Sequence, residues 1–240
     1  MRRLNLTTLL IGVNVVVYGW LVGTGGLASD RALYEHGALL GIACTYGGQW
    51  WRIVSGAFLH GGLLHIGMNM LALYVVGNDV ELVYGTARFA LIYAIAMVGS
   101  GLAIVYFVPH DLTVGASGAI FGLFGALLAV GLRLGSPGRR LIGRMLPVLV
   151  VNLVLTFTIP NISAAGHVGG LITGFLAGLV LFFGAPARRS QYVFALADPQ
   201  RPAAVETLEQ PPVETIDQPP EAGPHEEESA PPLEVRDPRE

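Results

Sequence analysis

The stretch VGASGAIFGLFGALLAVGL, residues 114–132, is apolar enough to lie in a membrane, yet it contains the short sequence GASG. A helix needs about 20 apolar residues to cross a bilayer, and somewhat fewer when it is short. Glycine weakens helices, and a hydroxyl group in the hydrocarbon region needs a hydrogen-bond partner. We therefore expect a membrane helix that begins at Ser117 and holds this hydroxyl for a reason other than helix stability.

The composition of the whole chain is that of a membrane protein. Of its 240 residues, 52% are hydrophobic and only 13% are charged, and the mean hydropathy is +0.58. These values predict an all-α membrane protein that crosses the bilayer several times. Six segments are apolar enough to form membrane helices: 9–22, 65–80, 89–108, 117–134, 146–159 and 166–183.

The arginines predict how these six segments are oriented. Most of them fall at the N-terminus, between the second and third segments, between the fourth and fifth, and after the sixth. These regions lie on one side of a six-span protein, and positive loops stay in the cytoplasm. We therefore expect both termini in the cytoplasm. The short loops and minimal core favour a bacterial cell membrane over an organelle.

The C-terminal part of the chain has a different character. Between Asp198 and Glu240 lie 12 of the 17 acidic residues, and residues 201–240 have frequent prolines and no aromatic side chain. Such a segment cannot bury enough surface to offset its ordering entropy. We expect a membrane region, 1–187, and a disordered acidic tail in the cytoplasm, 188–240. The tail could recruit a partner, but the composition favours a solvated extension that activity does not need.

Polar side chains from three distant segments are expected at one depth, near the outer membrane surface. The second, fourth and sixth segments cross in the same direction, so their first residues share a side. Histidine and asparagine are costly in hydrocarbon and usually face a bundle interior or a water-filled cavity. The residues concerned are His60, His65, Asn69, Ser117 and His167.

These residue types fit nucleophilic catalysis. A hydroxyl becomes a nucleophile when a base takes its proton, and neutral histidine is the usual base, so Ser117 and His167 are the candidate pair. His65 and Asn69 stand four apart on one helix face, and both can donate hydrogen bonds to a developing oxyanion. The backbone N–H of Ser117, at a helix N-terminus, is a further donor.

The glycines explain how such a pair can meet. Gly118 and Gly122 lie one turn apart in the fourth segment, and Gly170, Gly174 and Gly178 form a row in the sixth. Small residues at this spacing let two membrane helices approach closely. We therefore expect the two helices to pack against each other. Gly115 lets the chain turn sharply into the helix and lets a substrate approach the backbone.

These motifs, in this order, resemble the rhomboid intramembrane serine proteases. The resemblance rests on GASG at 115–118, the histidines and asparagine at 60, 65 and 69, GHVGG at 166–170 and WR at 51–52, and it covers about residues 5–185. It implies a six-transmembrane-helix rhomboid bundle over residues 1–187. It also implies a serine–histidine dyad below the outer membrane surface, in a cavity open to water.

By motif position, the resemblance implies Ser117 as nucleophile, His167 as general base, and His65 and Asn69 as oxyanion-site side chains. Four residues are implied to support the site. His60 is mainly structural, Gly115 and Gly118 shape the turn and the packing, and Phe121 lies where an aromatic ring packs on the catalytic histidine. Glu81 and Gly85 resemble an E-x3-G turn after the second span.

We therefore expect an intramembrane serine endopeptidase that cleaves transmembrane or juxtamembrane segments of membrane proteins. The alternatives are a non-catalytic relative that binds transmembrane helices and a small-solute channel or transporter. The expected partners are transmembrane substrates and the lipid bilayer. No nucleic acid, metal or cofactor is expected, because HExxH is missing and no carboxylate accompanies His60 and His65. The acids of the membrane region lie in loops or at the cytoplasmic end, so the dyad is expected to lack a carboxylate partner.

Other polar and aromatic residues have structural interpretations. Asn14 and Asn152 are expected to form hydrogen bonds between helices. Trp20 and Trp51 are expected at the membrane interface. Arg52 is expected to tie the long first loop to lipid headgroups or to backbone carbonyls. The single cysteine, Cys44, excludes an internal disulfide.

Overall fold

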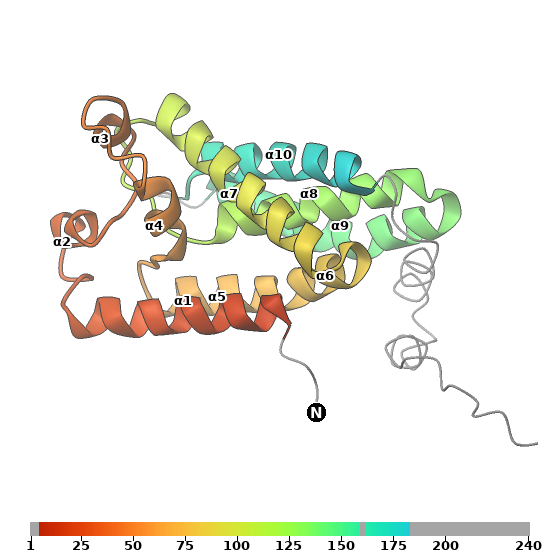
Figure 1. Ribbon diagram of the computed structural model, residues 1–240, viewed down its shortest axis with the longest axis horizontal. Coiled ribbons are helices and arrows are strands. Elements are labelled where there is room, and N and C mark those ends of the chain that lie inside the picture. Colours follow the sequence, from red (N-terminus) through yellow and green to blue (C-terminus); the bar gives the residue numbers. More distant parts are fainter. Residues whose placement is uncertain (1–4, 159–161, 183–240) are drawn as a thin grey trace, which may run out of the picture.

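The computed structural model describes residues 5–158 and 162–182, and most of these residues are helical (Figure 1). Within these two ranges the only β-type pairing is an isolated bridge between Leu39 and Thr113. The expected all-α architecture is therefore confirmed. The expected tail, 188–240, lies outside the described residues.

Five helices in the described ranges are long and apolar enough to cross a membrane. One of these spans is continuous but contains a π-helical turn, η1, between α5 and α6. The five spans are α1 (Leu6–Gly23), α5 (Leu63–Ala72) with η1 (Leu73–Gly77) and α6 (Asn78–Tyr84), α7 (Thr86–Phe107), α9 (Gly135–Thr158) and α10 (Ala164–Phe182). The chain is therefore a multi-pass membrane protein.

The fourth expected segment, 117–134, corresponds to α8 (Ser117–Arg133), which is apolar but has only 17 residues and is not among these five spans. This helix packs against α7, α9 and α10 (Figure 1), and most of its residues are buried. Because other helices surround α8, it meets protein rather than lipid over most of its length. The count of six spans stays a prediction.

The fifth expected segment begins earlier than hydropathy suggested. We expected 146–159, but α9 begins at Gly135, so Arg139, Arg140 and Arg144 lie in the helix rather than in a loop. Hydropathy detects only the part of a helix that suits hydrocarbon. Pro137 lies in the first turn, where a missing N–H costs nothing and its fixed φ favours the helix.

The close packing of α8 against α10 is confirmed. A Cβ atom at Gly170 would collide with the carbonyl oxygen of Gly118, and one at Gly174 would collide with that of Gly122. The two backbones therefore touch where these glycines alternate. This contact brings the first turns of the two helices together.

Glu81 joins three helix ends at the opposite end of the bundle. Its carboxylate accepts hydrogen bonds from the backbone N–H groups of Leu6 (3.0 Å) and Thr7 (2.9 Å) at the start of α1. It also accepts from the hydroxyls of Thr7 and Thr86, both at 2.8 Å. The first N–H groups of a helix lack intrahelical partners, so the carboxylate satisfies donors that would otherwise be unpaired. Gly85, with φ of 78°, makes the turn into α7.

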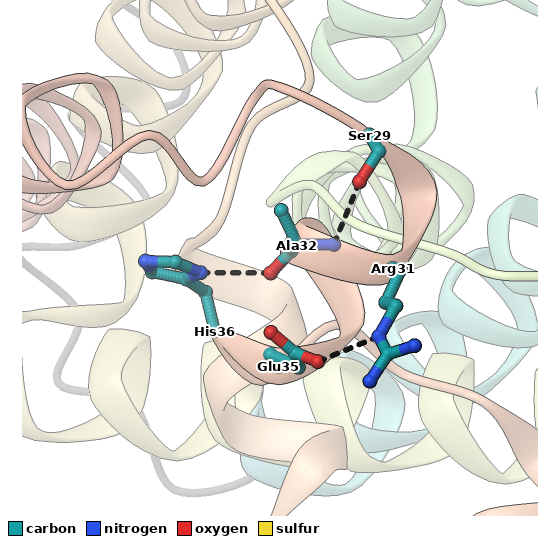
Figure 2. Close-up of polar contacts among 5 residues, drawn as sticks. All are labelled: Ser29, Arg31, Ala32, Glu35 and His36. Carbon is teal, nitrogen blue, oxygen red and sulfur yellow. Dashed lines mark hydrogen bonds and ion pairs between the residues drawn. The ribbon is translucent and has the colours of Figure 1, made fainter.

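The long segment between the first two spans contains three short helices, α2 (Asp30–Glu35), α3 (Gly41–Thr45) and α4 (Arg52–Phe58), gathered at one end of the molecule (Figure 1). In α2, the Ser29 hydroxyl accepts the Ala32 N–H at 3.1 Å and so caps the helix (Figure 2). An exposed ion pair of 2.9 Å joins Arg31 and Glu35 on the same helix (Figure 2).

Arg52 is the internal anchor of this segment. Its side chain is buried, and its guanidinium donates to the carbonyl oxygens of Tyr34 (2.7 Å) and Ala38 (2.9 Å). It also lies 3.9 Å from the centroid of the Tyr34 ring. Of the two expected roles, the tie to backbone carbonyls is therefore the correct one.

The expected interhelical hydrogen bonds of two asparagines are wrong. The Asn14 amide donates to the carbonyl of Leu10, and the Asn152 amide donates to that of Val148, both at 2.8 Å. Each amide bonds within its own helix, because a carbonyl four residues earlier is always within reach.

Candidate active site

Ser117 begins α8 after a sharp turn at Gly115. Gly115 has φ of 125°, which L side chains rarely adopt, and its N–H donates to the carbonyl of Gly56 at 2.9 Å. The turn directs the chain from a loop into a buried helix. The first N–H groups of α8 lie at the end of the helix where Ser117 is, and they lack acceptors within the helix.

His167 lies in the first turns of α10, directly across from this serine. The Nε2 atom of His167 is 2.7 Å from Ser117 Oγ, although the residues are 50 positions apart. The glycine contacts between α8 and α10 make this approach possible, since larger residues would separate the helices. The imidazole is buried, with 8% of the residue exposed.

Two other groups hold the His167 ring. Phe121, one turn after Ser117, stacks on it with ring centroids 4.2 Å apart and planes 14° apart. Thr156 in α9 places its hydroxyl oxygen 2.7 Å from Nδ1. Sequence reasoning missed Thr156. The available signal was the short link between the fifth and sixth segments, which puts the end of α9 at the depth of His167.

His65 faces the same site from α5. Its Nε2 atom lies 2.8 Å from the position that a Cβ at Gly115 would occupy, so only glycine leaves room for it. Its Nδ1 atom accepts a long hydrogen bond of 3.4 Å from the backbone N–H of Gly61. A neutral histidine that accepts at Nδ1 carries its proton on Nε2. That N–H is directed at the turn before Ser117.

Asn69 and His60 lie behind His65. The buried Asn69 amide donates to the His65 carbonyl at 2.9 Å, which leaves a second amide N–H. The fully buried His60 ring packs edge-on against His65, with centroids 5.1 Å apart. Neither ring nitrogen of His60 has a hydrogen-bond partner among the described residues. Gly118 packs against Ser100 of α7, where a Cβ would collide with the serine hydroxyl.

The fold and the site together define a multi-pass all-α membrane protein in which a serine hydroxyl meets a buried imidazole. A family model described as the Rhomboid domain matches residues 47–183, which include Ser117 and His167. The chain therefore belongs to the rhomboid family.

Several curated proteins are similar to the chain. It is 39% identical over 176 residues to the rhomboid protease GluP of Bacillus subtilis (strain 168), an alignment that covers 73% of this chain and 34% of GluP. It is 37% identical over 156 residues to RHOMBOID-like protein 4 of Arabidopsis thaliana, covering 64% of this chain and 39% of that protein. The chain thus spans well under half the length of these two relatives.

Proposed function

We propose that the chain is an intramembrane serine endopeptidase that cleaves transmembrane or juxtamembrane segments of other membrane proteins. The observation that carries the proposal is the distance of 2.7 Å between Ser117 Oγ and His167 Nε2. This is hydrogen-bonding distance for a nucleophile and its general base. The similarity to GluP, which is named a rhomboid protease, supports the same activity.

In the proposed reaction, His167 Nε2 takes the proton of Ser117 as Oγ attacks the substrate carbonyl carbon. The resulting imidazolium then gives this proton to the leaving amine, and the acyl-enzyme forms as the peptide C–N bond breaks. A water molecule then attacks the ester, with His167 again acting as base. The ester C–O bond breaks, the new carboxyl end of the substrate leaves, and Ser117 recovers its proton.

The negative charge on the carbonyl oxygen needs donors that are fixed in advance. We assign this role to the backbone N–H at the start of α8 and to the side chains of His65 and Asn69. The Gly61 hydrogen bond to His65 Nδ1 supports the assignment, because it leaves the proton on Nε2, near Gly115. The bond from Asn69 to the His65 carbonyl uses only one of the two amide N–H groups.

The substrate must expose a peptide bond to this site. An intact transmembrane helix hydrogen-bonds its own peptide groups, so the segment has to unwind before cleavage. We propose that it enters laterally between the second and fifth spans and that small or helix-destabilising residues favour cutting. Replacing glycine or proline near a cleavage site by leucine should then slow cleavage.

We also propose six spans with both termini in the cytoplasm of a bacterial cell. The distribution of arginines supports this orientation, since most of them lie at the ends of spans that would face the cytoplasm. The catalytic pair then lies near the outer surface. Reporter fusions at each terminus and at the loops test the orientation.

The second candidate function is a non-catalytic rhomboid-like protein that binds transmembrane helices. The chain also matches RHOMBOID-like proteins of Arabidopsis thaliana, whose names do not call them proteases. Such a protein has no need for a serine and a histidine at bonding distance. The contact between Ser117 and His167 therefore favours the protease.

A fluorophosphonate probe tests the proposal directly, because it labels activated serines. The purified full chain in detergent should be labelled, and both Ser117→Ala and His167→Ala should abolish labelling. Ser29→Ala is a matched control, since this serine caps α2 in the loop region and should leave labelling unchanged. Labelling that persists in Ser117→Ala, or a folded wild type that neither labels nor cleaves a panel of single-span proteins, would reject the protease.

A further inference from the structure

The hydroxyl of Thr156 makes two short contacts, and their chemistry determines where its proton lies. The oxygen is 2.7 Å from the backbone carbonyl of Asn152 and 2.7 Å from Nδ1 of His167. A carbonyl oxygen can only accept, so the first contact is a hydrogen bond only if the hydroxyl donates to it. The hydroxyl has one proton, so it must accept at the second contact. The proton in that contact therefore belongs to Nδ1.

A proton on Nδ1 also determines the state of the other ring nitrogen, Nε2. A neutral imidazole that carries its proton on Nδ1 has a lone pair on Nε2. The Nε2 atom faces Ser117 Oγ at 2.7 Å, so the lone pair is aimed at the serine proton. The opposite tautomer would place a proton on Nε2 and could not act as a base toward Ser117.

We propose that Thr156 is the positioning residue of the catalytic histidine: it holds His167 in the tautomer and ring orientation that leave Nε2 free to take the Ser117 proton. This inference rests on the proposed function and deepens it. Phe121 restrains the face of the ring, and Thr156 restrains its far edge. Together they oppose rotation of the ring about its Cβ–Cγ bond, which would move Nε2 away from Ser117 and Nδ1 away from Thr156.

The surroundings of Thr156 explain why its hydroxyl can hold the His167 ring in place. Thr156 is buried, with 3% of the residue exposed, so water does not compete for Nδ1. Thr156 is β-branched and lies within α9, where few rotamers are allowed and one of them bonds the carbonyl four residues earlier. The hydroxyl is therefore fixed before the histidine binds to it. A carboxylate, the usual partner of a catalytic histidine, is replaced here by an oriented neutral acceptor.

The tautomer can be measured without any substrate. With ¹⁵N-labelled histidine in the full chain, the ring nitrogens of His167, assigned by loss of its signals in His167→Ala, should show a protonated Nδ1 and an unprotonated Nε2. Thr156→Val keeps the shape of the side chain but removes the acceptor, and it should shift His167 toward the other tautomer. Thr156→Ser should retain the wild-type pattern. A wild type with its proton on Nε2, or a Thr156→Val spectrum identical to wild type, would overturn the inference, even if proteolysis is confirmed.

Kinetics provide the second readout. Thr156→Val should lower kcat about tenfold with little change in KM, the scale of one lost hydrogen bond, and Thr156→Ser should recover most of the rate. Thr158→Val is the matched control, because this exposed threonine makes the same 2.7 Å bond to a carbonyl in α9. An equal loss in Thr158→Val, or no recovery in Thr156→Ser, would contradict positioning. If the wild type has no activity, the proposed function fails while the spectrum still decides the tautomer.

Discussion

Phe121 lies almost flat on His167, with ring planes 14° apart and centroids separated by 4.2 Å. Both rings are buried, and both residues come from helices whose backbones touch. The stack opposes rotation of the imidazole about its Cβ–Cγ bond, because that rotation would tilt the ring into the Phe121 ring. Ring orientation is therefore a product of helix packing, and it can be tested separately from stability.

Phe121→Ala is expected to reduce both stability and reactivity. Removing a buried phenyl ring costs about 3–5 kcal/mol in soluble cores and would free the His167 ring. The fluorophosphonate labelling rate per folded molecule should fall. Phe124→Ala is the control, because Phe124 is equally buried and packs beside Phe121. It should lower the unfolding temperature but leave labelling of the folded fraction unchanged; equal losses of labelling would mean that the stack has no specific role.

Gly170→Ala should separate α8 from α10. The added methyl group would collide with the carbonyl oxygen of Gly118, which is backbone and cannot move aside alone. We expect a loss of stability of about 1–3 kcal/mol, as for overpacked cores, and a marked loss of cleavage. Gly143→Ala in α9 has open space around it and should be neutral or slightly stabilising. Thermal unfolding and a cleavage assay measure both effects, and wild-type behaviour of Gly170→Ala would contradict the close contact.

Gly115→Ala tests the turn before Ser117. The substitution strains a backbone with φ of 125° and places a methyl group 2.8 Å from His65 Nε2. Gly25→Ala at φ of 77° has the same kind of strain with nothing nearby. Each should lose about 1–3 kcal/mol of stability, but only Gly115→Ala should also lose labelling. If both variants label like the wild type, His65 does not need the space beside Gly115.

Glu81→Gln should destabilise the bundle without changing the chemistry. The carboxylate accepts four hydrogen bonds from α1 and α7, whereas an amide turns one acceptor oxygen into a donor. A buried donor facing another donor costs about 1–3 kcal/mol. Glu35→Gln removes an exposed ion pair and should have almost no effect. Unfolding in detergent measures the difference, and labelling per folded molecule should equal that of the wild type in both variants.

Much of the architecture could be predicted from local sequence. Apolar length located six helical segments, and glycine spacing identified α8 and α10 as helices that pack against each other. The same logic failed at the start of α9, where arginines lie within the helix, because hydropathy reports solvent preference and not backbone conformation. It also failed for Asn14, whose amide finds its acceptor in its own helix.

The sequence alone singled out Ser117 and His167 as the candidate pair, since they lie at the starts of helices that glycines allow to touch. Only the tertiary structure decided which atom of His167 faces the serine and which group faces the other ring nitrogen. Thr156 carries no motif, and its hydroxyl, already oriented within α9, meets His167 only when α9 lies against α10. A hydrogen bond depends on tenths of an ångström and on angles, and these are set by the packing of all the helices together.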